Sequence, residues 1–138
     1  MVVLSAVAHY HTIRCKDVVL GKRDSVFLYG ATHNFIDAEM VEKINIPSEP
    51  FDGFTVVIPG HNTMQCNTWV PKLQVTIGNY NFVDSFYVVD VADTNVVLGV
   101  QWMYSIGDHS INYQIPEMKF QYSTGVLRVV RGHHTYPK

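Results

Sequence analysis

Short apolar runs separated by Gly, Pro and Asn turns make up most of this chain. Two runs flank the turn Gly21-Lys22-Arg23 and predict a β-hairpin, with strands over residues 12–20 and 24–28. Similar runs predict further strands at 54–58, 64–70, 73–77, 82–91, 96–98, 111–115, 118–122 and 126–130. This pattern predicts an all-β fold, a small closed β-barrel with one or two short helices.

Two segments have helical spacing. Asp37 is a predicted N-cap for a helix over residues 38–44, with Met40, Val41 and Ile44 on its buried face. Residues 102–106 predict one or two further helical turns, closed by a glycine at the C-terminal end.

Composition narrows the class of protein. The 138 residues are 47% hydrophobic and 16% charged, which is typical of one globular domain. A net charge of −2 argues against direct nucleic acid binding, since nucleic-acid-binding domains are usually basic. The apolar start at residues 1–8 is too short to span a membrane and lacks the basic start of a signal peptide, so we expect no membrane partner. An intracellular, cytoplasmic location is the expectation.

Isolated reactive residues have ordinary interpretations. His9 and His11 lack a third ligand at suitable spacing, so no metal site and no cofactor are predicted. Two tryptophans, Trp69 and Trp102, are predicted core residues. His33 is interpreted as a turn residue that satisfies local backbone groups. Cys15 and Cys66 are predicted to be reduced thiols, and His61 is predicted to be exposed. Asp90 and Asp93 would point to opposite faces of a strand, so they are not predicted to form a carboxylate pair.

Two stretches carry a more specific signal. The first is Phe27-Leu28-Tyr29-Gly30-Ala31-Thr32-His33-Asn34-Phe35-Ile36, an apolar strand that breaks at Gly-Ala and resumes after a polar turn. Glycine there permits close approach of backbone to backbone or to a ligand. The second is Val96-Val97-Leu98-Gly99-Val100-Gln101-Trp102.

In their sequence and order, these stretches resemble the retropepsin-like aspartic proteases of Gypsy-type LTR retrotransposon gag-pol polyproteins. The resemblance runs over residues 12–132, which leaves residues 1–11 as an N-terminal extension and 133–138 as a C-terminal tail. It implies a retropepsin barrel and a homodimer that binds a peptide or polyprotein segment. The implied substrate-binding residues are Gly30 and Ala31 in the loop, and Gly60, His61 and Asn62 in a flap. The implied second signature, next to the loop, is Val97, Leu98 and Gly99.

One departure from the family pattern changes the predicted activity. Leu28 stands where the family has its catalytic aspartate, and Tyr29 where it has a small residue, before Gly30, Ala31 and Thr32. Aspartic protease chemistry needs two carboxyls that share a proton. Leucine has no ionisable group, and Asp24 would lie about 13 Å away along the strand. We therefore predict an inactive domain.

Three hypotheses follow for the function, and whether the chain is an enzyme is left uncertain. The first is a retropepsin-like domain that has lost catalysis. The second is an active aspartic endopeptidase that processes a polyprotein, in which either the catalytic position is not Leu28 or the loop is altered in this copy alone. The third is a co-opted peptide-binding or dimerisation module. Tyr29 bears on all three, because a large side chain at a tight site typically costs about 1–3 kcal/mol and would loosen the loop or weaken the dimer.

Overall fold

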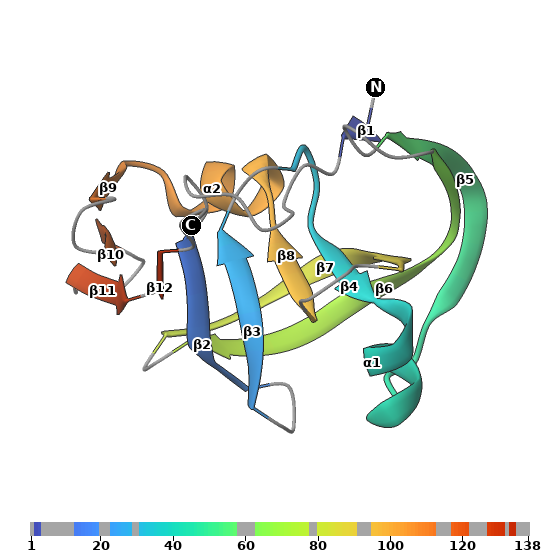
Figure 1. Ribbon diagram of the computed structural model, residues 1–138, viewed down its shortest axis with the longest axis horizontal. Coiled ribbons are helices and arrows are strands. Elements are labelled where there is room, and N and C mark those ends of the chain that lie inside the picture. Colours follow the sequence, from blue (N-terminus) through green and yellow to red (C-terminus); the bar gives the residue numbers. More distant parts are fainter. Residues whose placement is uncertain are drawn as a thin grey trace.

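The computed structural model describes residues 2–3, 13–19, 23–28, 31–57, 63–77, 80–90, 95–112, 117–121, 127–131 and 133–134. Two short helices and twelve strands are assigned there (Figure 1). In chain order they are β1 (Val2–Val3), β2 (Ile13–Val19), β3 (Arg23–Leu28), β4 (Phe35–Asp37), α1 (Ala38–Lys43), β5 (Glu49–Val57), β6 (Met64–Ile77), β7 (Tyr80–Val89), β8 (Val96–Leu98), α2 (Val100–Ile106), β9 (His109–Asn112), β10 (Glu117–Gln121), β11 (Leu127–Arg131) and β12 (His133–His134).

Most strands belong to one sheet of nine, in the order β1-β5-β6-β7-β4-β8-β3-β2-β12, and a smaller sheet has the order β11-β10-β9. β2 also pairs with β6, through Val18 with Ile77 and Val19 with Thr76. The strands from β6 to β2 therefore form a ring, because the last of them pairs with the first. Figure 1 shows this part of the sheet curving round. The predicted all-β fold with two short helices is confirmed. The closure is partial, because the returning contact is short and β5 extends the sheet beyond it.

The three-residue strand β8 lies between β4 and β3 in the large sheet. It pairs in parallel with β3 and antiparallel with β4, and all three of its side chains are fully buried. A strand covered on both faces has no polar position, which explains the unbroken apolar run at residues 96–98. In this register Leu28, the last residue of β3, lies opposite Leu98.

The strands differ from the predicted ones at several places. β4 has no predicted counterpart, and β5 begins at Glu49 instead of residue 54. Residues 64–70 and 73–77 form one strand, β6, whose register against β7 shifts between Val70 and Leu73. Pro71 sits in this irregularity, where a missing N–H does not break the hydrogen-bonded ladder. Tyr80, predicted in a turn, begins β7, since its ring is buried and packs on Phe82.

The helices occur where the spacing predicts them. α1 buries Met40 and Val41, while Ile44, predicted on the same buried face, is only half-buried at its C-cap. Asp37 occupies the N-cap position, but its side chain makes no capping hydrogen bond, so the predicted capping interaction is wrong. α2 ends at Gly107 with φ of 70°, a backbone conformation that favours glycine.

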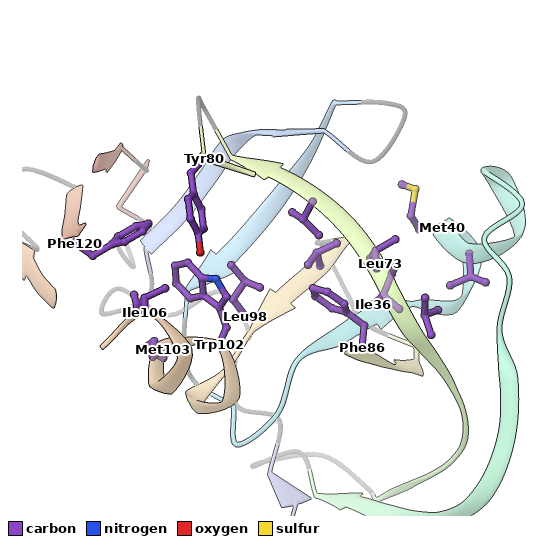
Figure 2. Close-up of a cluster of buried hydrophobic side chains, with 14 residues drawn as sticks. Ile36, Met40, Leu73, Tyr80, Phe86, Leu98, Trp102, Met103, Ile106 and Phe120 are labelled. Atoms are coloured by element: carbon purple, nitrogen blue, oxygen red, sulfur yellow. The ribbon is translucent and has the colours of Figure 1, made fainter. Parts of the chain in front are cut away.

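The larger core joins the barrel to α2 and the small sheet. Trp102 is fully buried, as predicted, and Figure 2 shows its indole between Leu98 and the rings of Tyr80 and Phe120. Phe120 comes from β10 and meets Tyr80 edge to face at 4.9 Å, so the small sheet packs on the barrel through aromatic contacts. Trp69, also predicted in the core, is only half-buried.

Segments near both ends of the chain take part in the large sheet. β1 lies within the predicted N-terminal extension and pairs with β5, and β12 lies within the predicted tail and pairs with β2. The domain boundaries themselves stay a prediction. Neither helix in the described part of the chain has the length and apolar character needed to cross a bilayer.

Core truncation gives a test of this packing. Phe86 is fully buried in β7, whereas Val83 on the same strand is 60% exposed. We expect Phe86→Ala to lower the free energy of unfolding by about 3–5 kcal/mol. The matched change Val83→Ala should alter it by less than about 0.5 kcal/mol. Urea denaturation measures both, and equal losses would contradict the described burial.

Candidate active-site loop

Gly99 brings the two sequence stretches into direct contact. A Cβ at this position would lie 2.4 Å from the carbonyl oxygen of His33 and 2.9 Å from that of Ala31. The next residue, Val100, donates its backbone N–H to the Ala31 carbonyl at 3.1 Å. The φ of Gly99 is −107°, which other residues also adopt, so the backbone conformation does not require glycine here. The requirement is steric, because a side chain would collide with the loop backbone.

Asn34 fixes the same contact from inside the protein. It is the buried polar residue of the described core, with 0% exposure. Its Oδ1 accepts the Gly99 N–H at 3.0 Å, and its Nδ2 donates to the Ser85 carbonyl at 3.2 Å. Its backbone carbonyl accepts the Tyr87 N–H at 2.9 Å. Asn34 therefore ties the loop to both α2 and β7.

Gln101 adds a second tie from α2. Its Oε1 accepts the Asn34 N–H at 3.3 Å. Its Nε2 lies 2.9 Å from both Asp84 Oδ1 and Ser85 Oγ, and 3.2 Å from the Ser85 carbonyl. Asp84 Oδ1 also accepts the Ser85 N–H at 2.8 Å. We call these four residues, Asn34, Asp84, Ser85 and Gln101, the loop network.

Beside the loop, half-buried rings form an aromatic cluster made of His33, Phe51, Phe54, Trp69 and Tyr87. The Phe54 and Tyr87 rings meet edge to face at 4.8 Å, and the Trp69 ring stacks on Tyr87 at 6.1 Å. The cluster packs on a second core, which includes Ala31, Phe35, Val56, Cys66, Val89 and Val97. Cys66 is buried and free, in agreement with the reduced-thiol prediction for this residue.

His33 lies in a bend, as predicted for a turn residue, and its ring belongs to this cluster. Its ring lies 5.9 Å from Phe54 and 5.5 Å from Tyr87, and its Nδ1 is 2.9 Å from the Thr32 hydroxyl. The expected role in satisfying backbone groups is therefore wrong, because the ring bonds to a side chain and packs on rings. Burial lowers the pKa of His33, because the charged imidazolium loses hydration there.

The structure covers the predicted site residues unevenly. Leu28 ends β3, Ala31 is 7% exposed, and the Thr32 side chain is half-buried. Val97, Leu98 and Gly99 adjoin the loop, with the first two fully buried. Tyr29, Gly30, Gly60, His61 and Asn62 lie outside the described residues. The strands that flank the predicted flap turn, β5 and β6, do pair as a hairpin, with Val56 opposite Met64.

A family model described as retroviral aspartyl protease matches residues 7–117. The chain belongs to this family. Its fold is similar to the crystal structure of the retroviral protease-like domain of Ddi1 from Leishmania major, with a TM-score of 0.64 and 11% identity. That match covers 88% of this chain and 92% of the other. No curated protein has a sequence that matches this chain.

The loop network of this retroviral aspartyl protease domain is the part of the site that the sequence did not predict. Asn34 and Gln101 lie inside the two stretches singled out above, but nothing in the sequence pairs them. Asp84 and Ser85 interrupt the apolar pattern of β7, which was a usable signal of a polar contact there. In the described residues, no group of three or more His, Cys, Asp or Glu side chains could hold a metal ion.

Gly99→Ala tests the close contact in this aspartic protease fold. Its Cβ would meet backbone atoms of His33, which cannot move aside as a flexible side chain can. We expect a loss of about 2–4 kcal/mol in the free energy of unfolding, as for other overpacked sites with a broken buried hydrogen bond. Val100→Ala is the control, because the next position in the chain is 57% exposed and should change the free energy of unfolding by less than about 0.5 kcal/mol. Equal losses in urea denaturation would contradict the contact.

His33 makes a pH-dependent contribution to stability. Its pKa is lowered in the folded state, so between that value and the ordinary value of about 6.5 the unfolded chain binds more protons. The contribution is full above pH 6.5 and falls as the pH drops toward the folded pKa. We expect the His33 ring to titrate below 6.5 by NMR, and Phe54→Ala to move the midpoint upward. A midpoint at or above 6.5 in the unchanged chain would contradict the described burial.

Proposed function

We propose that this chain is a retropepsin-like aspartic protease domain, derived from a Gypsy-type LTR retrotransposon gag-pol polyprotein, that has kept its scaffold and lost catalysis. The observation that carries the proposal is Leu28 at the end of β3, opposite Leu98 and directly before the loop held by Gly99. The resemblance puts the catalytic aspartate at this position, which lies within the residues 7–117 that the family model matches.

The chemistry explains why one residue decides the activity. In aspartic proteases two carboxyls share a proton, so that one acts as an acid while the other activates water. A leucine side chain neither ionises nor orients a water molecule. A homodimer of this chain would place two leucines where the reaction needs two carboxylates.

Other acids near the loop offer no substitute. Asp24 in β3 pairs with Val18 of β2, and four residues of strand place it about 13 Å from Leu28. Asp84 reaches the loop only through Gln101, and its Oδ1 already accepts two N–H groups. Asp37 lies at the start of α1, past the end of the loop.

The aromatic cluster favours a second candidate function, a co-opted module that binds a peptide or dimerises. Its rings are half-buried and adjoin the loop through His33. Partly exposed aromatic side chains are frequent in recognition sites, where they bury large areas and lose little conformational entropy. Peptide binding without cleavage fits both this candidate and the first, since a retained cleft would still take a polyprotein segment.

Restoring the carboxyl tests the proposal. Proteolysis of casein at mildly acidic pH would compare the unchanged chain with Leu28→Asp combined with Tyr29→Ser. The matched control combines Leu28→Asn with Tyr29→Ser, because asparagine has the shape of aspartate without its acid chemistry. We expect cleavage only by the aspartate variant, blocked by a transition-state-mimicking aspartic protease inhibitor, and sedimentation at the assay concentration to show a dimer.

The other outcomes are informative. Cleavage by the unchanged chain would establish the alternative, an active endopeptidase with a different catalytic group. A folded aspartate variant that does not cleave would contradict the retained cleft. In that case peptide binding and the oligomeric state would decide whether the chain is a co-opted module.

A further inference from the structure

A cleft of about 640 Å³ lies where β7, α2 and β10 meet. The lining residues are Tyr80, Asn81, Phe82, Val83, Asp84, Ser105, Ile106 and Gln121. Its volume is in the range of ordinary ligand sites. It shares one residue, Asp84, with the loop network and none with the aromatic cluster. This cleft is therefore separate from the surface used in the proposed function.

The polar groups of the cleft offer acceptors. Both hydrogen bonds of the Asp84 carboxylate go to Oδ1, which leaves Oδ2 without a partner in the described structure. The Ser105 hydroxyl donates to the Trp102 carbonyl at 2.6 Å, so its oxygen lone pairs remain available. Among the described residues that line the cleft there is no Lys, Arg or His, so none of them balances the charge of Asp84.

The apolar groups of the cleft suit the stem of a basic side chain. The Tyr80 and Phe82 rings are stacked at 5.2 Å and an interplanar angle of 25°. Phe82 is half-buried, so part of its side chain is accessible, and Figure 2 shows Ile106 on α2 close to Trp102. Aromatic faces attract cations, and methylene stems cover apolar surface while the charged end keeps polar partners.

We propose that this cleft binds a lysine or arginine side chain of a partner polypeptide. The ammonium or guanidinium group bonds to Asp84 Oδ2 and the Ser105 oxygen, and the stem lies against Phe82, which shares a face of β7 with Asp84. The charge sets the choice of partner, because an acidic residue would be repelled by the like charge of the Asp84 carboxylate. The proposal is independent of catalysis and of the proposed peptide cleft at the loop.

Matched peptides test the charge requirement. The probes are acetyl-Leu-Lys-Leu-amide, its arginine form, and versions with norleucine or glutamate in the middle. Norleucine keeps the stem and removes the charge. Backbone amide shifts in NMR spectra of the full chain would be followed during titration. We expect saturable shifts at residues 81–84 and 105–107 with the basic peptides, and affinity at least about fivefold lower with norleucine, as for a partly exposed ion pair.

Variants locate the binding site. Ser105→Lys places a like charge at the cleft on an exposed position of α2, so the fold should persist while binding of the basic peptides is lost. Asp84→Asn retains an acceptor for Ser85 and Gln101, and it should abolish the preference for lysine over norleucine. Asp90→Asn, an exposed position just past the end of β7, is the control and should leave the affinity unchanged.

Three results would overturn the proposal. One is equal binding of the lysine and norleucine peptides, which would make the cleft a purely apolar surface. Another is the absence of saturable shifts at residues 81–84 up to millimolar peptide. The third is a response confined to residues 31–34, which would place the peptide at the loop and not in this cleft.

Discussion

The contact between Gly99 and the backbone of the loop is the constraint on which the rest of this site depends. With a Cβ position only 2.4 Å from the His33 carbonyl oxygen, no larger residue fits unless the backbone moves. Because the backbone at Gly99 lies so close to the loop, the Asn34 side chain accepts the Gly99 N–H and the Gln101 side chain accepts the Asn34 N–H. Buried amide groups that bond to each other in this way hold the loop in one position, since leaving any of them unpaired is costly.

Two separate cores support this contact from opposite directions. The larger core places α2 through the buried Trp102, and the second core places β5 and β6 against Phe35 and Val97. β8 lies between them and contributes to both, with Val97 in one core and its neighbours Val96 and Leu98 in the other. The position of the loop therefore follows from the packing of the whole barrel, and not from the loop sequence alone.

The support of the loop is chemically independent of the catalytic group that the resemblance places at Leu28. The described ties use a glycine, backbone amides, two side-chain amides and one carboxylate on β7. None of them needs an ionisable group at the end of β3. This independence explains how a family member can keep its fold with leucine at that position, because the scaffold and the chemistry rest on different residues.

The sequence alone predicted the all-β class, the hairpin before the loop, both helices and the burial of Trp102, because alternation, turn residues and apolar spacing are local patterns. It also singled out both stretches that meet at the site. It did not predict that Asn34, Ser85 and Gln101 bond to one another, that His33 packs among aromatic rings, or that residues 64–77 form one strand. Those features depend on strand register and on residues up to 67 positions apart coming together, and only the tertiary structure determines which of them meet.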